Sequence, residues 1–215
     1  MSGRRSARTA TARAARLPAI GFRSRSRVTS STLLLVGCVL AVPPAVAQDD
    51  PRLTRSRELA AQLQQALGGR LLAAIESGGP VEAIEVCTVE ASPIAGRLSE
   101  QSGAQVGRTA LRLRNPLNAP DAGARTVLEA FQLDLAAGSA AAPEYFQAGP
   151  DGSARYMSPI VTQPLCLACH GAEIAPEVAA AIAEHYPADQ ATGFALGDLR
   201  GAFIIDWPEP AAPGQ

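Results

Sequence analysis

The sequence predicts an α+β domain in which several strands form one antiparallel sheet with helices packed on one side. Three observations lead to this class. Leucines recur every four residues from Leu59 to Leu71, which is typical of an amphipathic helix. A hairpin signal lies in the second half of the chain, and an apolar segment that suits a buried strand closes it. Helices followed by turn-linked strands favour a layered α+β arrangement.

The first helix is expected from about Leu53 to Ile75, with its leucines on one face. The stretch Ser77-Gly78-Gly79-Pro80 should end this helix, because glycine and proline interrupt helical backbone. Pro80 then suits the first position of a second helix.

On the second helix, Ile84, Cys87 and Ala91 are spaced by three and four residues, so we expect them to share one inward face. Ser92-Pro93 is typical of a cap and a restart. A third short helical segment should therefore run to about Ser99.

After Gly103 the pattern changes. Leucines alternate with arginines from Thr109 to Arg114, which predicts a half-buried strand. The proline-rich stretch 115–121 should form a shaped loop. A helix is expected from about Ala122 to Leu135, and its inward residues should be Leu128, Phe131 and Leu135.

The remaining elements complete the predicted sheet. Residues 144–146 and 154–157 flank Gly149-Pro150-Asp151-Gly152 and predict a hairpin. A helix near Pro176 to His185 and a buried strand from Gly201 to Trp207 follow. The sequence thus predicts one domain over residues 48–207 and a flexible tail over 208–215.

The N-terminal 47 residues are typical of an export signal. Eight arginines and no acidic residue occupy the first 27 positions, and an apolar run follows from Thr32 to Val42. Small residues at Ala45-Val46-Ala47 suit a signal peptidase. We therefore expect a signal peptide at 1–47, cleavage after Ala47 and a periplasmic protein.

A lipoprotein is the competing interpretation of this leader. Leu35-Val36-Gly37-Cys38 resembles a lipobox, although apolar residues continue past the cysteine. Contact with a membrane is expected only if Cys38 is lipidated.

The predicted mature chain is acidic. From Gln48 onward it holds 11 arginines and 20 carboxylates, for a net charge of −9. Nucleic-acid binding depends on neutralising phosphates with basic residues, so this balance excludes it as a partner. A redox partner protein with a basic surface is the expected partner instead.

The segment Leu165-Cys166-Leu167-Ala168-Cys169-His170-Gly171 carries the chemistry. Two cysteines separated by two residues, with a histidine directly after, suit attachment of one c-type haem. Cys166 and Cys169 would form the thioethers and His170 would bind the iron. The same atoms could form a redox dithiol, take part in a zinc site, which needs four ligands, or match by accident.

A second iron ligand must come from elsewhere, and methionine or histidine is usual. Met157 lies on a predicted strand, where core packing is the ordinary role. His185 ends a predicted helix, where a surface role is commoner. Cys87 has no thiol partner once haem takes the other two, so it is either a ligand or a small buried apolar residue.

Several stretches together resemble the c-type haem domains of PAS-like fold, which occur as stand-alone exported cytochromes and as sensor domains of bacterial kinases and chemoreceptors. The resemblance covers most of the mature domain. The matching stretches are Ala83–Cys87, Gly107–Asp121, Tyr156–Ile160, Leu165–Gly171 and Gly193–Ala202.

The resemblance implies a PAS-like sheet with N-terminal helices packed on it and one covalent haem c, with His170 and Cys87 as axial ligands. The sequence departs from the family pattern at Ala122-Gly123-Ala124, where an aromatic-acidic pair is expected. Candidate partners for the haem propionates are Arg108, Arg112 and Arg114.

The function expected from these residues is low-potential electron transfer by a monohaem cytochrome, not enzyme catalysis. The lack of an output segment after residue 207 favours a carrier. The alternatives are a redox or gas sensor that acts through a partner protein by ligand switching at Cys87, and a small haem peroxidase. A four-helix cytochrome is the architectural alternative, but the hairpin and the final strand disfavour it.

Overall fold

The computed structural model describes residues 50–138 and 143–211 of the 215-residue chain. All of them belong to one compact unit. The predicted signal peptide with its cleavage site, the lipobox cysteine Cys38 and the last residues of the predicted tail lie outside this part. No helix in the described ranges is both long enough and apolar enough to cross a membrane.

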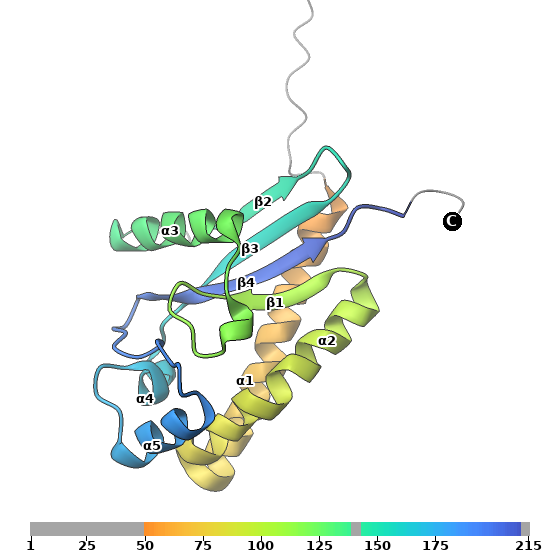
Figure 1. The fold of residues 1–215 in the computed structure, drawn as a ribbon. Coiled ribbons are helices and arrows are strands. Elements are labelled where there is room, and N and C mark those ends of the chain that lie inside the picture. The colour runs from red at the N-terminus through yellow and green to blue at the C-terminus, as the bar shows by residue number, and fades with distance from the viewer. Residues whose placement is uncertain (1–49, 139–142, 212–215) are drawn as a thin grey trace, which may run out of the picture. The chain divides into compact units, whose positions relative to one another are not determined.

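The centre of the domain is a single antiparallel sheet of four strands (Figure 1). Its spatial order is β1-β4-β3-β2. The strands are β1 Gln105–Thr109, β2 Tyr145–Ala148, β3 Ala154–Val161 and β4 Leu199–Trp207. The predicted α+β class, the hairpin and the final strand are confirmed.

Two N-terminal helices cover one face of the sheet: α1 Pro51–Glu85 and α2 Ala91–Ser102. Leu59 and Leu63 of α1 are fully buried against Phe203 and Ile205 of β4. Burial of a leucine side chain contributes about 1.5–3 kcal/mol. The leucine stripe seen in the sequence is therefore the contact that holds this helix to the sheet.

Gly79 interrupts α1 as the sequence predicts. Its φ of 79° and ψ of −172° lie outside the helical region. A positive φ is easily adopted by glycine alone, and Pro80 then begins the next helical turn with its fixed φ. This break sends the chain back toward the sheet and leads to the segment that carries Cys87.

Between α1 and α2 lies a π-helical segment, η2 Val86–Glu90, which sequence reasoning missed. A π turn holds one more residue than an α turn, so the face pattern shifts across it. Ile84 and Ala91 are buried, but Cys87 is exposed. The prediction that all three share an inward face is wrong for Cys87.

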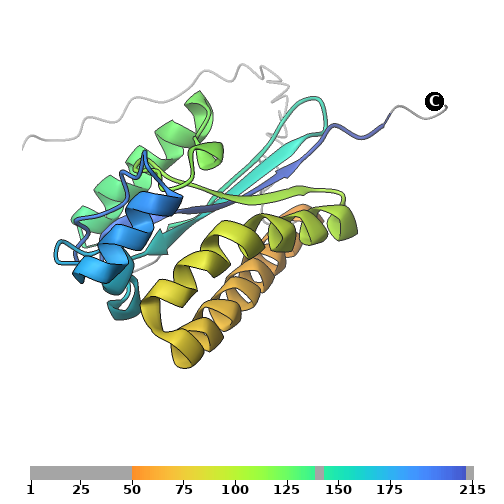
Figure 2. The same ribbon diagram turned by 60° about the horizontal axis from the view of Figure 1, so that its bottom comes forward.

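The helix α3 Ala122–Ala136 packs on the opposite face of the sheet (Figure 2). Leu128 and Phe131 contact Met157 and Ala202 there. Alternate strand residues point to opposite faces, and β3 and β4 are apolar on both. The prediction that helices lie on one side only is therefore wrong, although the predicted helix itself is confirmed.

The first strand ends earlier than predicted. β1 stops at Thr109, so residues 110–114 are not a strand. Leu111 packs against the α3 side, while the Leu113 carbonyl accepts a hydrogen bond from Gln190 N at 2.7 Å. The alternation of leucine and arginine reflects contacts with two different neighbours and no strand pairing.

Beyond the sheet, the segment that contains the cysteine motif folds into short helices. η4 Pro164–Cys166 leads directly into α4 Leu167–His170, and α5 Pro176–His185 follows. The predicted helix at 176–185 is confirmed. Both α4 and α5 lie near the C-terminal end of α1, and α5 contacts that helix (Figure 1).

Candidate functional site

Cys166, Cys169 and His170 lie on one continuous helical turn formed by η4 and α4. Cys169 and His170 follow Cys166 by three and four residues, so both side chains lie on the same face of that turn as the Cys166 side chain. Each is partly buried. Two thiols and one imidazole are therefore presented together, as the motif predicts.

Gly171 ends this turn where a larger residue would not fit. A Cβ atom on Gly171 would lie 2.6 Å from the Leu167 carbonyl oxygen. The Gly171 N–H donates to that oxygen at 3.0 Å, so the close approach is part of the helix end. Two further backbone hydrogen bonds join the motif to the segment 191–194: Phe194 N to His170 O at 2.9 Å, and Gly193 N to Gly171 O at 2.7 Å.

The His170 ring is held in one orientation. Its Nδ1 lies 2.6 Å from the Ala191 carbonyl oxygen, which can only accept, so Nδ1 carries the proton and Nε2 is the free nitrogen. Phe194 stands edge-on to the ring, with centroids 6.3 Å apart. A neutral imidazole with one nitrogen fixed by a backbone carbonyl is the form that binds metals.

The electrostatic surroundings also favour neutral His170. Burial, followed by the positive charges of Arg200 and Arg114, lowers the pKa of His170 to about 3. The hydrogen bond to Ala191 and the charge of Asp189 act in the opposite direction but are weaker. The imidazole is thus available as an electron-pair donor at neutral pH.

A buried ion pair supports the carbonyl that holds His170. Arg114 Nη2 and Asp189 Oδ2 are 3.1 Å apart, and the two side chains are only 10% and 8% exposed. Arg114 also donates to the carbonyls of Cys169 at 2.6 Å and Ala191 at 3.3 Å, while Asp189 accepts from Ala191 N at 2.9 Å. Arg114 is therefore engaged by protein groups, and Asp189 already balances its charge.

Cys87 reaches the neighbourhood of the motif from η2. Ile84, one turn before it, belongs to a buried cluster with Val178, Ile182 and Tyr186, and Cys169 packs against this cluster. Next to Cys87, the Thr88 hydroxyl hydrogen-bonds to the Tyr186 hydroxyl at 3.1 Å. The segment 84–88 and the motif are thus neighbours although they are far apart in sequence.

The thiols also influence one another. Burial raises the pKa of Cys169; Arg114 lowers it, and the charges of Cys87 and Cys166 raise it further. A raised pKa is the opposite of what a reactive dithiol requires, so the redox-dithiol alternative loses support. Cys87, Cys166 and Cys169 are free thiols.

The other two candidate ligands are placed elsewhere. Met157 is completely buried in the cluster between α3 and the sheet, which is the packing role expected for it. His185 is exposed at the end of α5. Over residues 50–138 and 143–211, no three His, Cys, Asp or Glu side chains come together in a group able to hold a metal ion.

Arg200 is a site residue that sequence reasoning missed. It lies at the irregular start of β4, opposite the register shift between Ile160 and Val161 of β3. Its Nε is buried without a hydrogen-bond partner within the described part of the chain. The available signal was an arginine directly before Gly201, in a strand whose only other charged residue is Asp206.

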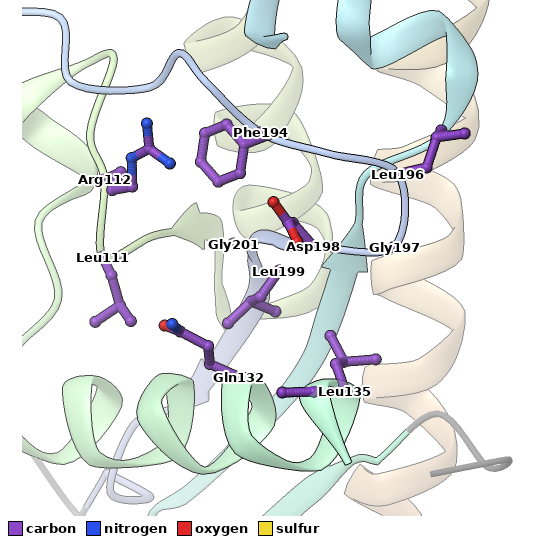
Figure 3. A pocket seen from close by; sticks show the side chains of 11 residues that line it. Leu111, Arg112, Gln132, Leu135, Phe194, Leu196, Gly197, Asp198, Leu199 and Gly201 are labelled. Atoms are coloured by element: carbon purple, nitrogen blue, oxygen red, sulfur yellow. The ribbon is translucent and has the colours of Figure 1, made fainter. Parts of the chain in front are cut away.

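A pocket of about 420 Å³ opens beside this site, between α3 and the loop that leads into β4 (Figure 3). Phe194 lines it and also contacts His170. None of the three motif residues lines it. The residues around it are Leu111, Arg112, Gln132, Leu135, Ala136, Phe194, Leu196, Gly197, Asp198, Leu199 and Gly201.

The fold and the sequence were compared with those of known proteins. The structure resembles the crystal structure of the cyanobacterial heme-protein Tll0287, with a TM-score of 0.56 and 29% sequence identity. The match covers 75% of this chain and 98% of that chain. No functionally curated protein matches the sequence.

The family model for Tll0287-like proteins matches residues 6–208. This range includes the sheet, the Cys87 segment and the whole cysteine motif. The chain therefore belongs to the Tll0287-like family.

Proposed function

We propose that this chain is an exported monohaem c-type cytochrome that transfers electrons at low potential. One observation carries the proposal: Cys166, Cys169 and His170 share one face of a helical turn, and the Ala191 carbonyl leaves the His170 Nε2 free. The chain belongs to a family whose crystallised relative is a haem protein.

The residues present fit a covalently attached haem. Cys166 and Cys169 would hold it through two thioether bonds, and His170 Nε2 would bind the iron as the first axial ligand. Cys87 is the proposed second ligand, because it is the remaining thiol and its segment lies beside the motif. Met157 is buried in the core, and His185 lies at the surface at the end of α5.

Haem iron supplies one-electron chemistry, and the protein sets the potential through the ligands and their surroundings. A Cys87 thiolate donates charge and would stabilise ferric iron, which lowers the reduction potential relative to His/Met ligation. Arg114 donates to the Ala191 carbonyl and Asp189 accepts from the Ala191 N–H, and these contacts keep His170 in one tautomer and orientation.

Export to the periplasm fits this chemistry, because the haem of c-type cytochromes is attached outside the cytoplasmic membrane. The predicted mature chain has a net charge of −9, so the proposed redox partner presents a basic surface. The PAS-like assignment of the sheet, with α1 and α2 packed on it, is part of the same proposal.

A redox sensor is the second candidate, and one observation favours it. Cys87 lies on a π-helical segment between two helices, and Thr88 connects that segment to α5 through Tyr186. Loss of Cys87 from the iron on reduction would change this contact, and a partner protein could detect the change. Nothing in the described site favours a peroxidase.

Spectroscopy of the exported protein, produced with a c-type haem maturation system, tests the proposal. The wild-type chain should show a ferric spectrum of His/thiolate type and a reversible one-electron titration. Cys166→Ala/Cys169→Ala should lose covalent haem. Absence of covalent haem in the wild type would overturn the proposal, and a high potential would overturn the thiolate assignment.

A further inference from the structure

Two arginines beside the motif have no acidic partner. Arg108 lies on β1 and Arg200 at the start of β4, and both are partly buried. The described residues contain seven salt-bridge contacts, and neither arginine takes part in any of them. Buried or partly buried guanidinium groups are normally paired.

Arg200 is the less satisfied of the two. Its Nε is buried without any acceptor, and Nη1 reaches only the Arg112 carbonyl at 3.3 Å. Its guanidinium carbon lies 5.5 Å from the centre of the Phe194 ring. A buried donor without a partner destabilises the fold, and more so when the donor is charged. The position requires an acceptor that the described protein atoms do not supply.

Arg108 lies on the face of the sheet that carries α1 and α2. It is directly opposite Phe203, and both residues belong to the face on which Val106 and Phe203 pack against α1. Burial lowers the pKa of Arg108, and the charges of Cys87 and Tyr186 act in the opposite direction. Arg108 is therefore on the Cys87 side of the motif.

The two guanidinium groups concentrate positive charge. Burial, followed by the charges of Arg114 and Arg108, lowers the pKa of Arg200 to about 10. Asp189 forms its salt bridge with Arg114, and its charge offsets only part of these effects on Arg200. A local excess of positive charge in a predicted mature chain of net charge −9 indicates a site for an anion.

We propose that Arg200 and Arg108 bind carboxylates, and that these are the propionates of the haem tethered at Cys166 and Cys169. The assignment rests on the proposed function. A guanidinium group matches a carboxylate in shape and charge, with two parallel N–H donors. Thioether attachment uses the vinyl groups of the porphyrin and leaves both propionates free to pair.

Arg112 and Arg114 do not meet the same requirement. Arg114 is paired with Asp189. Arg112 is exposed, lies 4.2 Å above the Phe194 ring and donates to the Gln190 carbonyl at 3.1 Å. Of the three arginines that the sequence suggested, only Arg108 remains, and Arg200 joins it.

The test uses haem-loaded protein and the pH dependence of its reduction potential. A guanidinium beside a propionate lowers the pKa of the propionate. Arg200→Gln and Arg108→Gln should each move the pH-dependent part of the potential to higher pH, and lower the potential where both propionates are ionised. Arg200→Lys should restore most of the wild-type profile. Arg125→Gln, on exposed α3 surface, should change nothing.

Other titratable or charged groups near the site are common to all variants, so the comparison removes their contribution. They are Tyr186, Arg114 and Asp189, and His170, Cys87, Cys166 and Cys169 are the residues proposed to hold the haem. Each variant is also checked for its thermal transition. Arg108→Gln provides an independent measurement if Arg200→Gln does not fold.

Two results would overturn the assignment. With haem attached, unchanged pH profiles in both Gln variants would mean that neither arginine meets a propionate. The second result is a wild-type reduction potential that changes with phosphate concentration at constant ionic strength, while the potential of Arg200→Gln does not. This result would assign the site to a free oxyanion. A wild-type chain without covalent haem would instead refute the proposed function itself.

Discussion

The Nδ1 atom of His170 lies 2.6 Å from the carbonyl oxygen of Ala191. This carbonyl is itself held by Arg114, and the N–H of the same residue is held by Asp189. The orientation of His170 therefore depends on an ion pair contributed by two loops outside the motif. Such outer contacts fix the tautomer of a ligating histidine and tune its basicity.

Replacing Arg114 by methionine should destabilise the domain strongly. The change leaves Asp189 as a buried charge without its partner, at 8% exposure. Removal of one member of a buried pair costs about 3–5 kcal/mol. The measurement is urea unfolding of the haem-loaded protein.

Arg55→Gln is the matched control for that change. Arg55 and Glu58 form an ion pair with side chains 42% and 52% exposed, and exposed pairs contribute about 0.2–1 kcal/mol. Equal losses of unfolding free energy in both variants would contradict a structural role for the Arg114–Asp189 pair.

Gly171→Ala should disturb the end of the motif turn. The added methyl group would meet the Leu167 carbonyl oxygen at 2.6 Å, and such crowding typically costs about 1–3 kcal/mol. Thermal unfolding measures the loss. Gly96→Ala lies within α2 with no atom within 4 Å of the new methyl group, so it should be neutral or stabilising by up to about 1 kcal/mol. A lower unfolding temperature for Gly96→Ala than for Gly171→Ala would refute the packing argument.

Cys87→Met should raise the reduction potential, because a neutral thioether replaces an anionic donor. The ferric absorption and electron spin resonance spectra should change at the same time. Val89→Ala, at an exposed position on the same π-helical segment, should leave both unchanged. A Cys87→Met protein with the wild-type spectrum would mean that the thiol does not bind the iron.

Met157 gives the complementary test. It is fully buried between α3 and the sheet, so Met157→Ala should reduce the unfolding free energy by about 2–5 kcal/mol. Met157→Leu conserves volume and should cost less than about 1.5 kcal/mol. Neither change should alter the haem spectrum, and a spectral change in Met157→Leu would restore methionine as a ligand.

Much of the fold could be predicted because local patterns and tertiary contacts agree. The leucine stripe from Leu59, the break at Gly79, the hairpin and the final strand each follow from one local rule. These elements require no knowledge of a distant neighbour, and their types are correct.

The errors arise where a distant contact overrides the local pattern. Residues 110–114 show the alternation typical of a strand, but the Leu113 carbonyl accepts a hydrogen bond from Gln190 N, and the pairing of β1 with β4 ends at Thr109. The placement of α3 on the second face depends on both sides of β3 and β4 being apolar, and sequence spacing does not assign each side to a helix.

In the candidate site, too, the features set by local sequence could be predicted, and those set by distant contacts could not. The grouping of Cys166, Cys169 and His170 could be predicted because the three residues lie close together in one short segment of the sequence. The π turn at Cys87 and the unpaired state of Arg200 depend on how separate segments meet. The only sequence signal for Arg200 is its position directly before Gly201 in a mostly apolar strand, and that position alone does not reveal whether the guanidinium group is paired.

Mass spectrometry of the denatured, exported protein tests the central claim most directly. If Cys166 and Cys169 carry a covalent haem, the mass of one haem should remain on the chain after denaturation and acid extraction. Proteolysis should then place it on the peptide containing Leu165–His170. A chain with only its polypeptide mass, or haem released on denaturation, would contradict the account.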